Sequence, residues 1–410
     1  LVNNWEATYF DFDDKRLLEI ARVARDLGIE LFVLDDGWFG KRNDDSSSLG
    51  DWFVNRDKLP EGLEGLGREI NKLGMKFGLW FEPEMVSPDI ELYRAHPDWC
   101  IHVPGRSRSL ARSQLVLDLS RKEICNWIIE TLSDILESAP ISYLKWDMNR
   151  SMTEIGSAEL PPERQRELPH RYILGLYRIL ETLNSRFPDI LFESCASGGG
   201  RFDPGMLYYM PQTWTSDNTD AIERLKIQYG TSMVYPLTAI GAHVSAVPNH
   251  QLARVTPLKT RGDVAMFGNF GYELDLTALD EEEKEMIKRQ IAEYKELRKL
   301  IQQGEFYRLL SPFEDNGDTA WMAVSADKRE AYLAYYKVLA EPNPPYYRLR
   351  LKGLDPEKHY RINGSDRVYG GDELLYAGIN LPLQFSGGHL SGAEIKGDFQ
   401  SMTWNLKAVD

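Results

Sequence analysis

Short apolar segments alternate with helical patterns over the first three hundred residues, and this alternation limits the possible folds more than any other feature. Strands are predicted at residues 8–10, 31–34, 76–81, 142–146, 190–193, 212–215, 235–240 and 264–267. Amphipathic helices are predicted at residues 14–27, 63–73, 122–136, 171–187, 221–229 and 281–302. Strands that are apolar throughout and joined by helices indicate a parallel sheet. Eight such units predict a (β/α)8 TIM barrel. The rival, a doubly wound open sheet, lacks its GxGxxG motif after the first strand.

The pattern changes near Gly304, where alternating segments and turn residues replace the βα units. Strands are expected at residues 321–324, 330–338, 346–351, 360–362 and 402–406. Turn signals separate them, such as Asn363-Gly364 and Gly387-Gly388. We therefore predict a catalytic barrel over residues 1–303 and a C-terminal antiparallel β-sandwich domain over residues 304–410.

Charge and composition exclude several classes of partner. The net charge is −15, from 48 basic and 63 acidic residues, so little is available to neutralise nucleic-acid phosphates or an anionic membrane. No apolar run reaches the roughly 18 residues of a membrane span. The chain opens LVNNWEATYF, without an initiator Met or a signal-peptide pattern, so a processed or excised fragment is expected.

Cysteine usage favours the cytoplasm and argues against a metal site. Cys100, Cys125 and Cys195 are odd in number and widely spaced, which is typical of reduced thiols. Neither CxxC nor HExxH occurs, so no structural zinc is expected. The sequence predicts no metal and no cofactor.

Acidic residues follow most of the predicted strands. In a barrel of this kind the reactive face lies at the carboxyl ends of the strands. The segments at those ends are Leu34-Asp35-Asp36-Gly37-Trp38, Phe81-Glu82-Pro83-Glu84, Trp146-Asp147-Met148-Asn149, Glu193-Ser194-Cys195 and Ser216-Asp217-Asn218-Thr219-Asp220. Acids and tryptophans therefore recur at one rim.

Each of these acids also has a structural interpretation. Asp35-Asp36 could cap a helix or hold a metal, and Asp220 could be the N-cap of the helix that begins at Ala221. Asp147 is harder to explain in this way, because a carboxylate at the end of an apolar strand is costly to desolvate unless it is partnered. Lys145 shares its strand face and would hold it ionised, as a nucleophile requires. A plain Lys–Asp ion pair at the rim is the alternative.

Two carboxylates that face one another across an aromatic-walled pocket are what glycoside hydrolysis needs. One attacks the anomeric carbon and the other protonates the departing oxygen. Retaining enzymes hold the two groups about 5–6 Å apart. The 10 Trp, 20 Tyr and 16 Phe fit either a large core or a surface on which sugar rings stack.

Five motifs resemble those of the bacterial α-galactosidases of glycoside hydrolase family 36. They are LFVLDDGWFG, KFGLWFEPEMVS, YLKWDMNR, ESCASGGGRFD and QTWTSDNTDAIERLKIQYG, in the family's order. The resemblance runs from Trp5 to about Leu274 and more loosely through the C-terminal domain. It implies a retaining, exo-acting enzyme that releases terminal galactose from melibiose or raffinose-type sugars. By the same resemblance, Asp147 is the nucleophile and Asp217 the acid/base.

The resemblance also implies a galactose pocket. Asp35 and Asp36 would accept hydrogen bonds from hydroxyls, including the axial one, and Lys145 and Arg112 would donate. The substrate-binding residues that it implies are Trp5, Asp35, Asp36, Trp80, Arg112, Lys145, Trp146, Asn149, Cys195 and Gly198. Cys195 is expected to contact the sugar rather than attack it, because a buried thiol is usually an apolar filler.

One departure from the family and several other functions remain open. Family members usually carry a β-rich domain before the barrel and are often tetrameric, whereas this chain begins near its first strand. The resemblance implies a small galactoside as substrate. It also implies a homo-oligomer, as in other family members. Alternatives are an α-galactosyl transferase, an α-N-acetylgalactosaminidase, or an inactive galactose-binding barrel. A metal-dependent hydrolase is disfavoured because the rim acids lack histidine partners.

Overall fold

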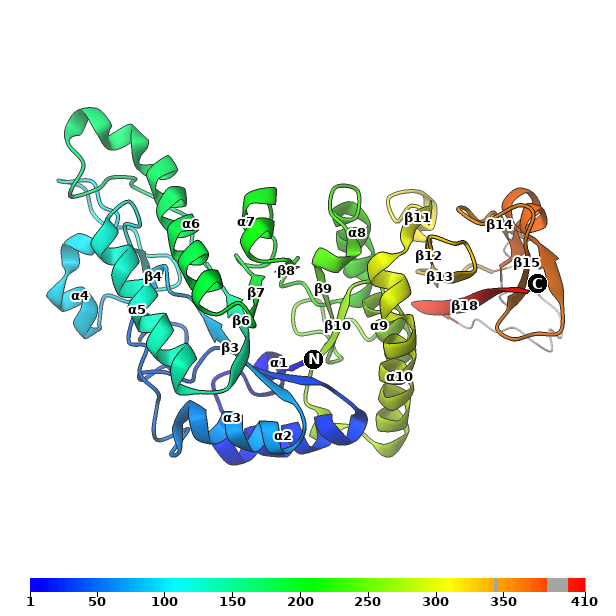
Figure 1. Cartoon of the computed structure of the whole chain (residues 1–410), viewed down its shortest axis with the longest axis horizontal. Coiled ribbons are helices and arrows are strands. Elements are labelled where there is room, and N and C mark those ends of the chain that lie inside the picture. The colour runs from blue at the N-terminus through cyan, green and yellow to red at the C-terminus, as the bar shows by residue number, and fades with distance from the viewer. Residues whose placement is uncertain (343–345, 382–396, 410) are drawn as a thin grey trace. The chain divides into compact units, whose positions relative to one another are not determined.

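Eight strands form a closed barrel in the computed structural model, which describes residues 1–342, 346–381 and 397–409 (Figure 1). The strand order around the barrel is β1-β10-β9-β8-β7-β6-β3-β2. Its strands are β1 Val2–Asn3, β2 Leu31–Leu34, β3 Lys76–Phe81, β6 Ile141–Trp146, β7 Leu191–Ser194, β8 Gln212–Trp214, β9 Ile240–Ser245 and β10 Asn269–Glu273. Strand β1 closes the ring because it pairs in parallel with both β2 and β10. The predicted TIM barrel is confirmed.

The chain divides into two compact units. One contains Leu1–Asp217 and Tyr272–Leu279, and the other contains Asn218–Gly271 and Asp280–Asp410. The domain boundary predicted at residues 303 and 304 stays a prediction.

The helices follow local sequence signals closely. They are α1 Trp5–Thr8, α2 Asp14–Leu27, α3 Gly62–Lys72, α4 Glu91–Ala95, α5 Lys122–Ser138, α6 Leu168–Arg186, α7 Pro204–Tyr209, α8 Ala221–Thr231, α9 Leu258–Ala265 and α10 Glu281–Gln303. Helix α2 begins at an Asp13 side chain that accepts the Arg16 N–H, and it ends at Gly28 with φ +94°. Asp220 caps α8 through the N–H groups of Ile222 and Glu223, as the sequence predicted.

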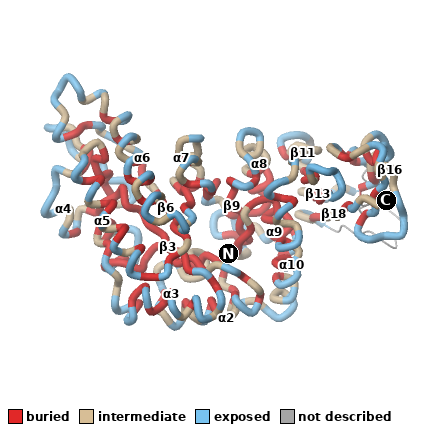
Figure 2. The backbone as a smooth tube through the Cα atoms, in the orientation of Figure 1, coloured by how far each residue is buried: buried red, intermediate tan, exposed pale blue. Residues whose placement is uncertain are grey.

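Burial explains why the barrel strands read as continuous apolar runs. Strand β9 is buried throughout, and β3 and β6 are buried at all but one position each (Figure 2). Parallel strands are covered on both faces, so they lack the polar alternation of a half-exposed strand.

Three of the predicted strands are wrong in place or type. Residues 8–10 are not a strand, because the Asn3 side chain accepts the Trp5 N–H and starts a helical turn there. The strand predicted at 235–240 begins only at Ile240, after a 3₁₀ turn over Leu237–Ala239. Residues 264–267 contain the end of α9, which is buried on several sides. An apolar run cannot distinguish such a helix from a strand.

The C-terminal region forms an antiparallel sheet, as predicted. Its six strands follow the order β11-β12-β13-β18-β15-β16, and β14 and β17 form a separate pair. Their bounds are β11 Glu305–Leu310, β12 Thr319–Val324, β13 Glu330–Lys337, β14 Arg348–Leu349, β15 His359–Ile362, β16 Val368–Gly370, β17 Ile379–Asn380 and β18 Gln400–Val409. Strands β11, β16 and β17 were not predicted, and the turn expected at Gly387-Gly388 lies outside the described residues.

No helix in the described part of the chain is both long enough and apolar enough to span a membrane.

Candidate active site

Acids that the sequence placed at strand ends lie after the carboxyl ends of four barrel strands, all within the first compact unit. Asp35 and Asp36 follow β2, Glu82 follows β3, Asp147 follows β6 and Asp217 follows β8. Parallel strands bring these ends to one edge of the barrel. The sequence prediction of a single acidic rim is therefore confirmed.

Asp147 is buried and held by three hydrogen-bond donors. Its Oδ2 accepts the Trp80 indole N–H at 3.1 Å and the Asn149 side-chain amide at 2.6 Å. Its Oδ1 accepts the Met148 backbone N–H at 2.8 Å. Donors that bond to a carboxylate fix its orientation.

Lys145 has a different partner from the one that the sequence suggested. Its ammonium donates to Asp35 Oδ2 at 2.8 Å, and both groups are buried. The same oxygen accepts the Asn3 side-chain amide at 2.6 Å. The orientation of Asp147 therefore depends on Trp80, Asn149 and Met148 rather than on an ion pair with Lys145.

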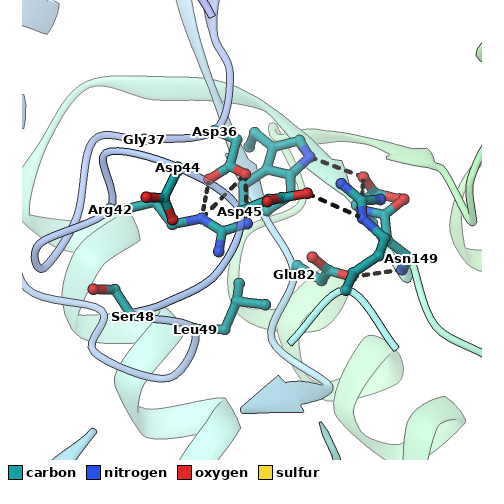
Figure 3. Close-up of polar contacts among 12 residues, drawn as sticks. Asp36, Gly37, Arg42, Asp44, Asp45, Ser48, Leu49, Glu82 and Asn149 are labelled. Carbon is teal, nitrogen blue, oxygen red and sulfur yellow. Dashed lines mark hydrogen bonds and ion pairs between the residues drawn. The ribbon is translucent and has the colours of Figure 1, made fainter. Parts of the chain in front are cut away.

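Asp36 forms a second buried ion pair, with Arg42. The guanidinium donates from Nη2 to Asp36 Oδ2 at 2.8 Å and from Nε to Oδ1 at 3.1 Å (Figure 3). Burial raises the pKa of Asp36, Arg42 opposes that shift, and the neighbouring Asp35 and Asp147 add to it. Asp35 and Asp36 are thus fixed as acceptors, but each already has a cationic partner.

Asp217 lies within electrostatic range of Asp147. Burial raises the pKa of Asp217, and the negative charge of Asp147 raises it further. Lys145 and Arg112 oppose the shift. A raised pKa keeps this carboxyl protonated to higher pH, which is the state that a general acid requires.

Gly198 supports the segment that carries Asp217. It has φ +81°, and a Cβ there would lie 2.5 Å from Ser216 Cα and 2.8 Å from Asp217 N. Only glycine allows this close approach of the two backbones. The sequence assigned Gly198 to space for the sugar; the structure adds a packing role.

Cys195 follows β7 and is buried, and its thiol interacts electrostatically with Asp147 and Asp217. Burial raises the pKa of its thiol, and Asp147 and Asp217 raise it further. A neutral thiol is a poor nucleophile, which agrees with the expectation that Cys195 does not attack.

The three tryptophans predicted to bind the sugar have different surroundings. Trp80 contacts Asp147 directly, and Trp5 packs edge-on against Tyr9 and Phe10 with ring centroids 5.2 Å apart. Trp146 is fully buried, and its indole N–H donates to Glu84 at 2.7 Å. The indole N–H of Trp146 is therefore engaged within the protein, and the predicted contact of Trp146 with the sugar stays a prediction.

Arg112 occupies an unusual backbone position beside the site. It and Ser113 have φ values of +51° and +57°, and its side chain is 40% exposed. Its guanidinium lies 3.9 Å from Asp45. It can supply positive charge at the rim, since it acts electrostatically on Glu82 and Asp217.

A buried ion pair that sequence reasoning missed supports both neighbours of Asp147. The Arg201 guanidinium donates to both oxygens of Glu84, at 2.8 and 2.9 Å, and its Nη1 lies 3.1 Å from Met148 Sδ. Glu84 also accepts the Trp146 indole N–H and the Tyr172 hydroxyl. This Glu84–Arg201 clamp therefore fixes the residues on either side of Asp147.

Asn3, Arg42 and Glu82 were also missed as site residues. Asn3 ends β1 and binds Asp35, Arg42 binds Asp36, and Glu82 accepts the Asn149 backbone N–H. The sequence signal for Glu82 was its place at a strand end. For Asn3 and Arg42 no comparable signal was present, because the partners lie on other segments.

Within the described residues, no group of three or more His, Cys, Asp or Glu side chains could hold a metal ion. Carboxylates at this rim are instead occupied by lysine, arginine and amide donors.

The closed parallel barrel, with acids after the carboxyl ends of its strands, places the chain in the (β/α)8 class of folds. The chain belongs to the melibiase family, whose model matches residues 1–304; the model of the glycosyl hydrolase family 36 C-terminal domain matches residues 318–406.

Similar proteins are α-galactosidases. The chain is 67% identical over 409 residues to α-galactosidase AgaA of Geobacillus stearothermophilus and 50% identical over 410 residues to Mel36A of Lactobacillus acidophilus. It covers 54% of each of these proteins and is itself fully covered. The chain thus spans about half the length of the curated relatives it matches.

Solved structures agree with the fold. The crystal structure of AgaA matches with a TM-score of 0.95 over 100% of this chain and 55% of that one. The α-galactosidase from Lactobacillus brevis, 52% identical, matches with a TM-score of 0.96 over 100% of this chain and 55% of that one. Variants of AgaA have been crystallised with raffinose and with stachyose.

Proposed function

We propose that this chain carries the catalytic barrel of a retaining, exo-acting α-galactosidase. The observation that carries the proposal is that two aspartates at the same rim of the barrel, Asp147 and Asp217, have different surroundings. Asp147 is held by three donors, whereas the pKa of Asp217 is raised by burial and by the charge of Asp147. A carboxylate whose orientation is fixed by donors suits a nucleophile, and a carboxyl group with a raised pKa suits a general acid.

The reaction proceeds in two displacements. A carboxylate oxygen of Asp147 attacks the anomeric carbon while the bond to the departing oxygen breaks, and Asp217 donates its proton to that oxygen. Asp217, now ionised, removes a proton from water, which attacks the anomeric carbon and releases Asp147. Two inversions leave the product in the α configuration.

Recognition of galactose depends on the acids after β2. Asp35 is held by Lys145 and Asn3, and Asp36 is held by Arg42, so both present fixed acceptors to sugar hydroxyls. An epimer that leaves such a buried acceptor unpaired is rejected strongly. Relatives that were crystallised with raffinose and stachyose support substrates that end in α-linked galactose.

Product stereochemistry and substrate choice test this proposal. We expect p-nitrophenyl α-galactoside to be cleaved in preference to the α-glucoside and the α-N-acetylgalactosaminide, with α-galactose as the first product in proton NMR. Preferred cleavage of the N-acetylated substrate would favour the N-acetylgalactosaminidase alternative. Early β-galactose would contradict the retaining mechanism.

Two substitutions separate the roles of the aspartates. Asp147→Asn should abolish turnover of every galactoside. Asp217→Asn should slow a substrate with a poor leaving group by about 10²–10⁴-fold, and an activated aryl galactoside far less. Similar losses on both substrates would contradict an acid role for Asp217.

A further inference from the structure

Glu82 is a buried carboxyl group beside the proposed nucleophile that the two-displacement mechanism does not use. It directly follows β3 and is completely buried. Its Oε1 accepts the backbone N–H of Asn149 (Figure 3). Within the part of the chain that the structure describes, its Oε2 has no hydrogen-bond partner.

The charges around Glu82 disfavour an additional anion. Asp147, after β6, and Asp36, after β2, both act on it as like charges. Among the described residues, Arg42 and Arg112 are cations that interact with it, and each also has another carboxylate nearby. Arg42 binds Asp36, and Arg112, whose side chain is half-exposed, lies 3.9 Å from Asp45. A buried carboxylate without its own cation is costly, and such groups take up a proton instead.

Glu82 also connects directly to the group that orients Asp147. The Asn149 backbone N–H bonds to Glu82, and the Asn149 side-chain amide donates to Asp147 Oδ2 at 2.6 Å. Asn149 Oδ1 in turn accepts the Ser197 hydroxyl at 3.1 Å. The position of the Asn149 amide therefore depends on the Glu82 carboxyl group.

We propose that Glu82 is a neutral carboxylic acid in the working protein, and that it positions Asp147 through Asn149 without adding a charge. The positioning role rests on the proposed function, because it takes Asp147 as the nucleophile. Protonation of Glu82 does not depend on that function.

Neutrality at Glu82 has a pH limit. Burial, followed by the charge of Asp147, raises the pKa of Glu82 to about 8, although the Asn149 N–H opposes the shift. As the pH rises through this value, Glu82 loses its proton and places a second anion against Asp147. Activity should therefore fall on the alkaline side for a reason separate from loss of the Asp217 proton.

Infrared difference spectroscopy tests the protonation directly. Because the pKa of Glu82 is about 8, the wild-type minus Glu82→Gln spectrum should contain a carboxylic-acid C=O band near pH 6.5 that disappears near pH 9.5. Glu91→Gln is the matched control: Glu91 is exposed, pairs with Arg94 and should give only a carboxylate band. A carboxylate band for Glu82 near pH 6.5 would overturn the proposal.

Kinetics test the positioning role. We expect Glu82→Ala to lower kcat/KM by about tenfold to a hundredfold, as small misplacements of reacting groups do. Glu82→Gln should recover most of that loss, because an amide reproduces the acceptor and the neutrality. Galactosyl fluoride needs little proton transfer, because fluoride is a good leaving group. With this substrate, the activity of Glu82→Gln should no longer fall near pH 8.

The outcomes separate this inference from the proposed function. A Glu82→Gln loss as large as that of Glu82→Ala, or an unchanged alkaline fall, would overturn the role of a neutral Glu82. If Asp147→Asn kept full activity, the proposed function would fail while the infrared band persisted. Should Glu82→Ala not fold, the Glu82→Gln spectrum and pH profile still decide.

Discussion

Buried charge at the acid rim is compensated residue by residue. Lys145 neutralises Asp35, Arg42 neutralises Asp36, and Arg201 neutralises Glu84, each at 2.8 Å. The removal of one member of such a pair leaves an uncompensated buried charge, which costs more than the pair itself contributes.

The Glu84–Arg201 clamp should be needed for stability and for activity. Glu84→Gln leaves Arg201 buried without its counter-charge, so we expect a loss of about 3–5 kcal/mol in unfolding free energy, measured by urea denaturation. Glu69→Gln is the control, because its ion pair with Lys72 is exposed to solvent and should contribute little to stability. Equal effects of the two substitutions would contradict a supporting role for the clamp.

Glu82 should also make stability depend on pH. The folded pKa of about 8 lies above the ordinary value of 4.5, so the folded state holds one more proton than the unfolded state between these limits. Its contribution to stability is complete below pH 4.5 and is lost as the pH rises through about 8, by up to about 1.4 kcal/mol per pH unit. Glu82→Gln should flatten this slope in urea melts at a series of pH values; an unchanged slope would contradict it.

The hydrogen-bond and ion-pair partners of the site residues could not be predicted from the sequence. Asp147 was found because an apolar strand ends there, a local feature. Its bond to Trp80, and that of Lys145 to Asp35, depend on strand register, in which Trp80 pairs with Lys145 across β3 and β6. Such register joins segments far apart in the chain, and no local pattern reports it.

At the scale of elements, the predictions are correct where local signals mark the ends of an element and wrong where burial on all sides removes the polar pattern. Helix α2 and strands β2 and β3 were predicted to the residue, because caps, glycines and periodicity mark their ends. The strand predicted at 264–267 was wrong because α9 is buried almost throughout and shows no polar face. Periodicity fails where an element has no contrast between its sides.

The loop after β7 packs closely against the segment after β8, at Gly198. Gly198→Ala places a Cβ 2.5 Å from Ser216 Cα and should displace Asp217, lowering kcat/KM by about a hundredfold. Gly230→Ala is the control: it lies in α8 with open space around it and should stabilise the protein by about 0.5–1 kcal/mol. Unchanged kinetics in Gly198→Ala would contradict the packing role.

At the scale of the whole molecule, the second compact unit contains a buried polar contact between α9 and β18. Asp263 accepts the Ser401 hydroxyl at 2.6 Å and pairs with Lys259, and burial raises the pKa of Asp263. The Tyr336 hydroxyl donates to the Asp263 carbonyl at 2.7 Å. Strands β13 and β18 are thus joined to α9 by hydrogen bonds.

Loss of this contact should destabilise the unit. We expect Ser401→Ala to lower the unfolding free energy by about 1–3 kcal/mol, since a buried carboxyl group loses a donor. Ser138→Ala, at the exposed end of α5, should change it by less than about 0.5 kcal/mol. Urea denaturation measures both changes, provided that the two variants have the same m value. Equal effects would show that the Ser401 hydrogen bond does not stabilise the protein.

The account depends most on Asp147 as the group that bonds to the sugar. A fluorinated galactosyl fluoride that forms the glycosyl intermediate quickly and releases it slowly should label the protein stoichiometrically. Peptide mass spectrometry should then find the galactosyl mass on the peptide that contains Asp147, and Asp147→Asn should take up none. Label on another residue, or turnover without any covalent label, would contradict the central claim.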